Sequence, residues 1–312
     1  PDSWDAFTKS ALESSYKQEF LEKTGLSIFK EDKAFDRFNG RIIFPIHSIS
    51  GRILGFGGRA LKKDEKAKYL NSPESEIYHK GKVLYGMYFS KSAIVKNDNC
   101  LIVEGYTDVI SMHQSGIENV VASSGTALGS EQLKLIGRYT KNITLLFDSD
   151  NAGVNAATKA IDLIHIESMT VKVALLPKGE DPDSYAKKYG GEGLTQFINQ
   201  QALDFVEFKI NLLDEKSKND PIKKVNLISE IMQSIAKIPD GITREVYIDK
   251  CSKLFEIGKQ ELENKVYELI HKRKTAKKVQ REIIKKVEDT SAPTVSHVKS
   301  EFQEREIIRF ML

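Results

Sequence analysis

The sequence has very little cysteine: Cys100 and Cys251 are the only two in 312 residues, and neither belongs to a Cys-x-x-Cys pair. This spacing argues against a disulfide framework and against a zinc site built from cysteines, and it favours a protein of the reducing cytoplasm. The chain has no run of about 20 apolar residues, the length that crosses a membrane. Its start lacks the charged and then apolar pattern of a signal segment.

The overall composition is that of an ordinary globular protein, with 40% hydrophobic and 29% charged residues. A length of 312 residues predicts two or three domains rather than one. The chain begins with Pro1 rather than methionine, and its last residues, IIRFML, stand in the middle of an apolar helical pattern. We therefore expect a fragment of a longer protein.

Positive charge is concentrated in the first third of the chain. The formal net charge is only +3, but residues 30–96 hold 14 lysines and arginines against 7 acids. Such an excess suits a surface that binds a phosphate backbone, and it equally suits a solvated basic face. Charge alone leaves both interpretations open.

The first hundred residues combine helix and strand patterns. Residues 1–29 show apolar side chains at helical spacing with a stop at Gly25, so we expect helices there. Strands at 41–46 and 52–56 flank a Ser-Gly turn at 50–51 and predict a hairpin.

Three glycines follow in the second strand, at Gly55, Gly57 and Gly58. Their spacing is not the GxGxxG of a nucleotide loop, and it indicates a strand with a close backbone approach. Residues 68–86, with Pro73 as a breaker, are predicted to be a loop.

From residue 99 onward, strand patterns alternate with helical ones. The apolar runs CLIV, NVVAS, NITLLF and VKVALL predict four strands. Helices are expected between them, to about residue 115, from about 130 to 139 and from about 153 to 166. Strands that are apolar on both faces and alternate with helices predict a parallel sheet with helices on each side.

The pattern after about residue 193 is helical as far as about residue 287. An apolar stripe there predicts a small packed bundle, and its residues are Val225, Ile228, Ile231, Met232 and Ile235. The basic run 271–286 is interpreted as the solvated face of a long helix, with a nucleic-acid or partner contact as the alternative. The stretch TSAPTVS, residues 290–296, predicts a linker.

Carboxylates follow three of the predicted parallel strands where these end. The six are Glu104 and Asp108 after the first strand, Asp148 and Asp150 after the third, and Asp181 and Asp183 after the fourth. Because the carboxyl ends of parallel strands line one crevice, we expect all six at one edge of the sheet. Crowded carboxylates raise one another's pKa unless a cation is present. Hard oxygen ligands suit Mg²⁺ with its waters and substrate phosphates, so the pattern predicts a Mg²⁺ site that handles phosphates.

Each of these acids also has a structural explanation when it is taken singly. Asp150 would serve as a helix cap and Glu104 as a solvated strand end. Their joint occurrence at three strand ends favours the metal site.

The same residues carry a family resemblance. VEGYTDVI followed by LLFDSDNAG resembles the Toprim domain, in which a glutamate ends one strand and Asp-x-Asp follows a later one. The order and spacing of the flanking motifs resemble the RNA polymerase domain of bacterial replicative DNA primases of the DnaG type. These motifs are FDRFNGRIIFPI, GRILGFGGRAL, KYLNSPESEIYHKG, LYG and GEDPDSY. The resemblance is dense over about residues 35–190 and looser towards both ends.

This resemblance implies an α/β fold with a Toprim-type, mostly parallel central sheet and helices on both faces. The implied parts are an N-terminal α+β basic subdomain (1–96), a Toprim catalytic subdomain (97–192), a helical subdomain (193–288), a linker (289–298) and the truncated start of a helicase-binding domain (299–312). The family's zinc-binding domain has no counterpart in a two-cysteine sequence, so no zinc is expected.

The resemblance also implies roles for individual residues. Glu104, Asp148 and Asp150 would be catalytic, Glu104 by activating the attacking hydroxyl or binding metal and the two aspartates as metal ligands. Asp108, Asp181 and Asp183 would complete the acidic cluster around Mg²⁺, with Mn²⁺ as the alternative ion. The groove for nucleic acid and nucleotides would be formed by Arg41, Arg59, Lys68, Tyr69, Asn71 and Lys80. The family's usual Asp-Gly-Asp is Asp148-Ser149-Asp150 here, which keeps the ligand spacing.

The implied activity is Mg²⁺-dependent synthesis of short RNA primers from ribonucleoside triphosphates on single-stranded DNA during DNA replication. The implied partners are the template, the RNA primer, ribonucleoside triphosphates and the replicative helicase, the last through a C-terminal domain that is missing or only begun. No membrane partner is expected. The alternatives are another Toprim enzyme, such as a nuclease or topoisomerase, and a non-catalytic nucleic-acid-binding module. No tyrosine stands in a context that indicates a topoisomerase, and the acidic cluster argues against a pure binding module.

Overall fold

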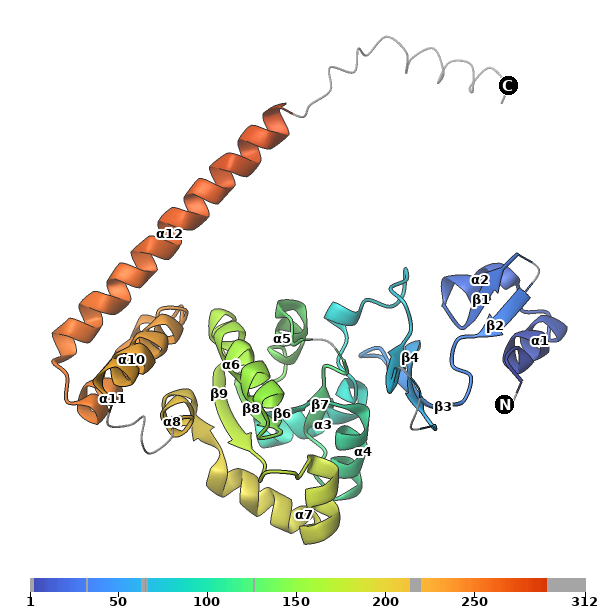
Figure 1. Cartoon of the computed structure of the whole chain (residues 1–312), viewed down its shortest axis with the longest axis horizontal. Coiled ribbons are helices and arrows are strands. Elements are labelled where there is room, and N and C mark those ends of the chain that lie inside the picture. The colour runs from blue at the N-terminus through green and yellow to red at the C-terminus, as the bar shows by residue number, and fades with distance from the viewer. Residues whose placement is uncertain are drawn as a thin grey trace.

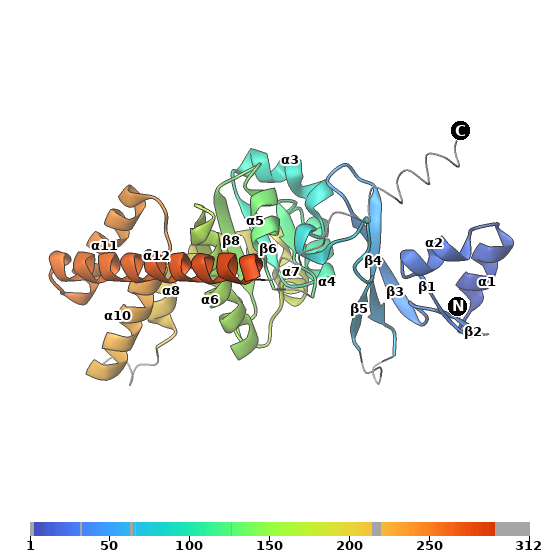
Figure 2. The same cartoon turned by 90° about the horizontal axis from the view of Figure 1, so that it is seen from above.

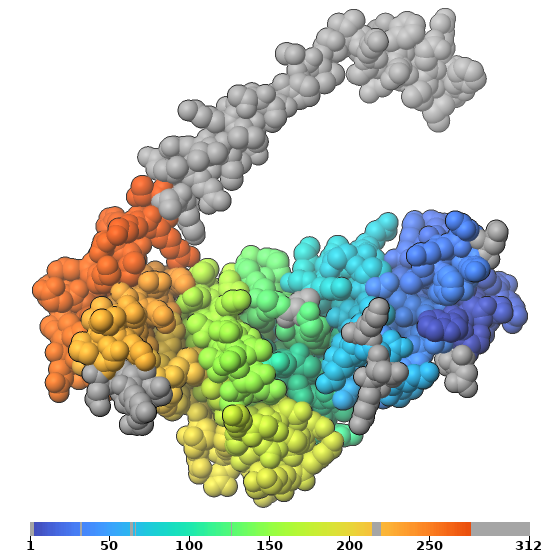
Figure 3. Space-filling model, in the orientation of Figure 1, coloured from blue at the N-terminus to red at the C-terminus, as the bar shows by residue number. Residues whose placement is uncertain are grey.

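The computed structural model describes residues 3–31, 33–62, 65, 67–125, 127–213 and 220–290. The predictions for 291–312, which include most of the linker and the start of a helicase-binding segment, lie outside these residues. The N-terminal part and the C-terminal helices stand at opposite ends, with the central sheet between them (Figures 1 and 3). No helix within the described ranges is long and apolar enough to cross a membrane.

The N-terminal part begins with two short helices and a small hairpin. Its elements are α1 (Ala6–Glu13), α2 (Gln18–Lys23), β1 (Ser27–Lys30) and β2 (Lys33–Asp36). The prediction of helix as far as residue 29 is therefore wrong at its end, where Ile28 pairs with Phe35 in antiparallel register. The physical reason is Gly25, whose φ of 67° ends the helical path just before a β-branched and aromatic run.

A three-stranded antiparallel sheet follows, in the order β3-β4-β5. Its elements are β3 (Arg41–His47), β4 (Ile53–Ala60) and β5 (Tyr69–Asn71), with the short 3-10 helix η1 (Lys80–Lys82) after them. The predicted hairpin is confirmed, while the stretch 68–86 is not only loop because it holds β5 and η1. The close approach expected at the glycines is also present: a Cβ on Gly57 would lie 2.4 Å from the ring of Tyr106.

The central sheet has the strand order β10-β9-β8-β6-β7. The strands are β6 (Cys100–Val103), β7 (Val120–Ala122), β8 (Asn142–Phe147), β9 (Thr170–Leu175) and β10 (Leu203–Asp204). The four predicted strands are present and parallel, so the expected fold class is confirmed. The antiparallel edge strand β10 was not predicted, because two residues are too few to show a periodicity.

Helices cover both faces of this sheet. They are α3 (Met87–Asn97), α4 (Tyr106–Gln114), α5 (Ser130–Ile136), α6 (Asn151–Ile166) and α7 (Pro182–Gln201). Alternate residues of the strands enter two separate cores, with Ile102 packed on the side of α6 and Val103 on the side of α4 and α7. Helix α3 was not predicted, since its apolar residues do not keep to one face. The boundary expected at 192/193 falls inside α7, which is non-helical at Gly190.

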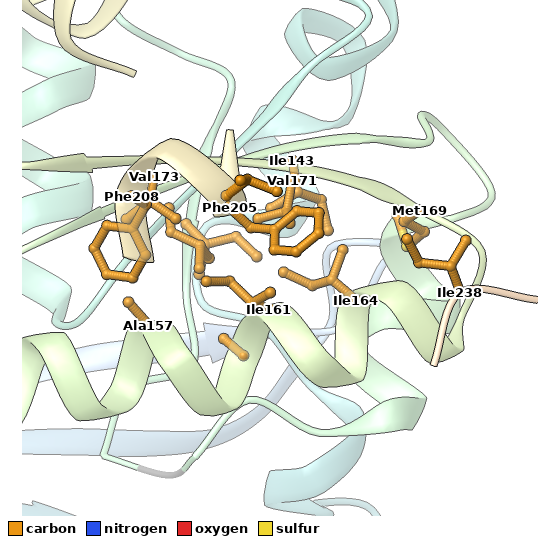
Figure 4. Packing of buried hydrophobic residues seen from close by; sticks show 14 of the residues in the cluster. Ile143, Ala157, Ile161, Ile164, Met169, Val171, Val173, Phe205, Phe208 and Ile238 are labelled. Atoms are coloured by element: carbon orange, nitrogen blue, oxygen red, sulfur yellow. The ribbon is translucent and has the colours of Figure 1, made fainter. Parts of the chain in front are cut away.

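The C-terminal helices share their core with the sheet. They are α8 (Phe205–Asn211), α10 (Pro221–Ile235), α11 (Gly241–Phe255) and α12 (Lys259–Thr290). Phe205 and Ile161 of α6 are fully buried in one continuous apolar cluster (Figure 4). Of the predicted apolar stripe, Ile231, Met232 and Ile235 are buried, whereas Val225 is exposed. Helix α12 leads away from the sheet (Figure 1).

Candidate active site

Two carboxylates flank the point where the chain changes its direction of travel across the sheet. From β6 the chain crosses to β7 on one side, and then to β8 on the other side of β6. Glu104 directly follows β6, and Asp148 directly follows β8. Ligands of open parallel sheets bind in the crevice at this kind of switch point, at the carboxyl ends of the strands.

A pocket of about 330 Å³ opens at this edge of the sheet. One wall is acidic and consists of Glu104, Asp108, Asp148, Asp181 and Asp183. The opposite wall comes from β4 and β5 and includes Arg59, Lys68 and Tyr69. The structure therefore brings together five of the six carboxylates and three of the six basic-groove residues that the sequence indicated.

Asp150, the sixth carboxylate, does not line the pocket. It is the N-cap of α6, where its Oδ1 accepts a hydrogen bond from the Gly153 N–H at 2.7 Å. Asp181 both lines the pocket and caps α7, with Oδ1 accepting from the Ser184 N–H at 2.7 Å. The cap explanation thus applies to both aspartates. It does not remove Asp150 from the site's electrostatics, because its charge still raises the pKa of Glu104 and of Asp148.

Crowding of negative charge is visible in the pKa values of the acidic wall. Burial raises the pKa of Glu104, and the charges of Asp148 and Asp150 add to this rise. Burial and then the charges of Asp181 and Asp150 raise the pKa of Asp148. Carboxylates that raise one another's pKa in this way stabilise a bound cation, because the cation removes their mutual repulsion.

Asp108 is the most strongly perturbed of these groups. It is only 9% exposed, and burial raises its pKa from 3.8 to about 6, with further contributions from Asp181, Asp148 and Glu104. The Gly105 N–H donates to its Oδ2 at 2.9 Å, which opposes the rise. Asp108 thus caps the first turn of α4 with a carboxylate whose charged form is disfavoured by burial and by the neighbouring acids.

Asp183 behaves differently from the rest of the acidic wall. Burial would raise its pKa, but hydrogen bonds from Lys187 and Ser111 outweigh burial, so the pKa is lowered. Its ion pair with Lys187 is 2.6 Å long. Because Lys187 already offsets the charge of Asp183, a bound metal ion would stabilise this carboxylate less than the others.

The acidic wall fits a hard divalent cation by the chemistry of its donors. All of its side chains offer carboxylate oxygens, which suit Mg²⁺ and Mn²⁺, and Glu104, Asp108 and Asp148 have raised pKa values. In the described part of the chain, no three His, Cys, Asp or Glu side chains already stand in a coordination geometry. One or two of the carboxylates would therefore hold an ion here, and substrate phosphates and waters would supply its other ligands.

Tyr106, Asn71 and Ser124 connect the two walls by hydrogen bonds. Only Asn71 was indicated by the sequence. Tyr106, which is 2% exposed, donates from its hydroxyl to Asn71 Oδ1 at 2.8 Å. Asn71 Nδ2 donates in turn to the Ser124 carbonyl at 2.9 Å. The ring of Tyr106 is stacked on Phe44 with centroids 5.0 Å apart. Asn71, expected to touch nucleic acid, is thus used to join β5 to the central sheet.

Gly153 is another residue that sequence reasoning missed. A Cβ there would lie 2.3 Å from the Asp148 carbonyl oxygen, so only glycine lets α6 begin directly against the end of β8. The spacing Asp-Ser-Asp-x-x-Gly was the available signal in the sequence.

Two of the expected basic residues lie outside the pocket. The side chain of Arg41 is only 8% exposed and is committed to the chain itself, with Nη1 donating to the Ala67 carbonyl at 2.8 Å. Lys80 belongs to η1, where its carbonyl accepts a hydrogen bond from Gln132 Nε2 of α5. On the pocket wall, the Arg59 guanidinium and the Lys68 ammonium lie 5.8 and 5.9 Å from the centre of the Tyr69 ring. The basic wall is therefore smaller than predicted and centres on Tyr69.

Three family models match successive parts of the chain. Residues 1–91 match the N-terminal domain of the DNA primase catalytic core, residues 101–186 match a Toprim-like domain, and residues 206–260 match the DnaB-helicase binding domain of primase. The last match lies within the helical part, upstream of the segment 299–312 where a helicase-binding domain was expected to begin.

Relatives and solved structures agree with these matches. A DNA primase of Halalkalibacterium halodurans is 34% identical over 99% of this chain and 50% of its own length, so the chain spans about half of that relative. A DNA primase domain from Pseudomonas aeruginosa is similar in structure, with a TM-score of 0.75, 33% identity and coverage of 87% of this chain and 85% of that one. A DnaG primase catalytic domain bound to single-stranded DNA gives a TM-score of 0.70, 32% identity and coverage of 85% and 83%.

Proposed function

This chain belongs to the DnaG-type bacterial DNA primases, and from that premise we propose that it is the part of a primase that polymerises RNA. It would join ribonucleotides into a short primer on single-stranded DNA. The observation that carries the proposal is the pocket in which an acidic wall faces Arg59, Lys68 and Tyr69. Phosphoryl transfer needs this combination, because catalysis there consists of positioning the groups and stabilising charge.

The acidic wall is proposed to hold the metal. Glu104 and Asp148 are the proposed ligands, and Asp108 and Asp181 add negative charge to the same pocket wall. When it is bound, Mg²⁺, or Mn²⁺ in its place, supplies positive charge to the phosphates and makes a 3′-hydroxyl more acidic. Glu104, which lines the pocket directly after β6, is the proposed acceptor for the proton of that hydroxyl.

The basic wall is proposed to hold nucleotide and template. Arg59 and Lys68 bind phosphates, since both project into the same pocket as the acids. Tyr69 offers a ring face on which a base can stack. The Tyr106–Asn71–Ser124 hydrogen-bond chain keeps the two walls at a fixed separation, and these residues act as positioning residues.

The proposed partners follow from the same family membership. Single-stranded DNA and ribonucleoside triphosphates would enter the pocket, and an RNA primer would leave it. The match of residues 206–260 to a helicase-binding domain supports a contact between α8–α11 and the replicative helicase. We place the activity in the cytoplasm, in keeping with two buried cysteines that are not joined in a disulfide.

Primer synthesis on single-stranded DNA tests the proposal. The chain is incubated with labelled ribonucleoside triphosphates and a single-stranded template, with Mg²⁺ or with a chelator, and the products are sized on a denaturing gel. Short RNA products that need both template and Mg²⁺ are expected. Shortening of the template without RNA synthesis would contradict the proposal and favour a Toprim nuclease. Metal-independent DNA binding without synthesis would favour a binding module.

A further inference from the structure

The turn of the β3–β4 hairpin and the start of α3 form a surface that combines aromatic rings with positive charge. We call it the aromatic platform and define it as His47, Arg52, Tyr88, Phe89 and Lys91. Its two elements meet at Gly51, where φ is +90° and a Cβ would lie 2.7 Å from Tyr88 Cζ. None of these residues lines the acidic pocket. Figure 2 shows α3 near the hairpin.

The rings of the platform support one another. His47 and Tyr88 are stacked with centroids 6.1 Å apart, and Phe89 meets them edge-on at 5.2 and 5.0 Å. Lys91 Nζ lies 4.7 Å from the centre of the Tyr88 ring and donates to the Ile49 carbonyl at 3.1 Å. Phe89 is nevertheless 58% exposed. The surface thus presents a large apolar ring that its neighbours hold in place.

Negative charge is missing from the segments that build this surface. Residues 41–60 and 77–97 contain no Asp or Glu. Their lysines and arginines are Arg41, Arg52, Arg59, Lys80, Lys82, Lys91 and Lys96. Both contacts of Lys91 are to neutral groups, a ring and a carbonyl, so its charge is left to act on a ligand. A polyanion complements this charge distribution.

Strand β4 connects the platform to the pocket. It begins at Ile53, next to the turn, and reaches Arg59 on the pocket wall six residues later. At about 3.3 Å per residue, this distance is about 20 Å. A nucleic-acid strand that leaves the pocket along β4 therefore meets the platform after a few nucleotides.

We infer that the aromatic platform stacks bases of the single-stranded DNA template outside the pocket, while Arg52 and Lys91 bind its phosphates. This inference rests on the proposed function. Rings interleaved with cations are the combination that binds single strands without reading their sequence, since every base has a π face. The platform would steady the template during synthesis and extend the footprint of the protein beyond the active site.

Binding to two kinds of strand separates stacking from simple charge attraction. Phe89→Ala is compared with Val95→Ala, a truncation at a residue that is 56% exposed on the same helix but outside the platform. Phe89→Ala should weaken binding to oligothymidylate by at least about fivefold, the effect of losing one stacked base. It should leave binding to an abasic strand of equal length unchanged, and Phe89→Trp should restore the affinity for oligothymidylate. Val95→Ala should bind both strands as the parent protein does.

Charge and strand length give further readouts. Lys91→Ala should lower the slope of log affinity against log salt by about 0.7. In a series of oligothymidylates of about 4 to 16 nucleotides, Phe89→Ala should reduce the affinity only for strands long enough to reach from the pocket to the platform. An equal loss with RNA strands supports the inference, because stacking does not read the sugar. A loss confined to RNA overturns the assignment to the template.

The outcomes distinguish failure of this inference from failure of the proposed function. If Lys68→Ala weakens DNA binding while Phe89→Ala binds oligothymidylate normally at every length, the platform is wrong and the primase function stands. A change in sedimentation of Phe89→Ala with unchanged DNA affinity likewise overturns the platform, in favour of self-association. If the parent protein neither binds single strands nor makes primers, the proposed function fails and the inference falls with it.

Discussion

Replacing Asp108 by Asn should make the metal-free protein more stable. The side chain is 9% exposed, and its pKa rises from 3.8 to about 6 because burial and the neighbouring carboxylates disfavour its charge. At about 1.4 kcal/mol per pKa unit, a difference of about 2.2 is worth roughly 3 kcal/mol of folding free energy. Asn has a similar shape, and its oxygen can still accept the Gly105 N–H. The variant should therefore gain up to about 3 kcal/mol at pH 7.5.

The gain has a defined pH dependence. Folded protein keeps the Asp108 proton up to about pH 6, whereas the unfolded chain releases it near pH 3.8. The parent therefore loses stability relative to Asp108→Asn as the pH rises through this interval, and the difference is constant above it. Below pH 3.8 both proteins carry a neutral side chain, and the difference should vanish.

Urea unfolding followed by circular dichroism in the presence of a chelator measures this difference. Asp183→Asn is the matched control, because the hydrogen bonds from Lys187 and Ser111 lower the pKa of Asp183, so loss of its charge should not stabilise the protein. Mg²⁺ should stabilise the parent more than Asp108→Asn, since the cation relieves the same repulsion. The reasoning is refuted if Asp108→Asn is no more stable than the parent at pH 7.5, or if its gain persists on acidification.

Three further predictions concern the basic wall and its support. Lys68→Ala should weaken single-stranded DNA binding and lower the slope of log affinity against log salt by about 0.7, whereas Lys80→Ala should change both quantities less because Lys80 lies outside the pocket. Binding titrations at several salt concentrations measure both variants, and a larger effect of Lys80→Ala would contradict the prediction. Tyr106→Phe removes the donor to Asn71 and should lower the free energy of unfolding by about 1–3 kcal/mol and reduce the kcat of primer synthesis. An unchanged melting temperature and kcat would show that this hydrogen bond contributes to neither. Gly57→Ala places a Cβ 2.4 Å from the Tyr106 ring and should destabilise the protein by about 1–3 kcal/mol in thermal melting. Gly81→Ala is the control, because a Cβ there meets nothing within 4 Å. Equal melting temperatures of the two variants would argue against close packing at Gly57.

The parallel sheet and its acidic edge could be predicted because both depend on local pattern. Apolar runs identify β6 and β8, and the rule that strand ends share one crevice places Glu104 and Asp148 together. The close contact at Gly57 was visible as a glycine cluster inside a strand. These features need only the nature and spacing of neighbouring residues.

Other features depend on side-chain direction and on distant parts of the chain, which spacing does not specify. Asp150 turns back to cap α6, and Arg41 is buried against backbone carbonyls, although both stand in charged motifs. Tyr106 was not singled out in the sequence, and its role appears only when β5 brings Asn71 to its hydroxyl. The strand β10 exists because β9 offers it an edge to pair with.

Primer synthesis by Glu104→Gln and Asp148→Asn tests the proposed site most directly, when it is measured beside DNA binding and thermal melting. Glu118→Gln is the control, because Glu118 is an exposed acid that precedes β7 and so lies near the amino end of that strand, whereas the pocket lies at the carboxyl ends. Both site variants should fold, bind single-stranded DNA and lose synthesis by orders of magnitude, since about 1.4 kcal/mol of barrier is tenfold in rate. Glu118→Gln should make primers as the parent does. Near-normal, Mg²⁺-dependent synthesis by Glu104→Gln and Asp148→Asn would contradict the assignment of the acidic pocket as the catalytic centre.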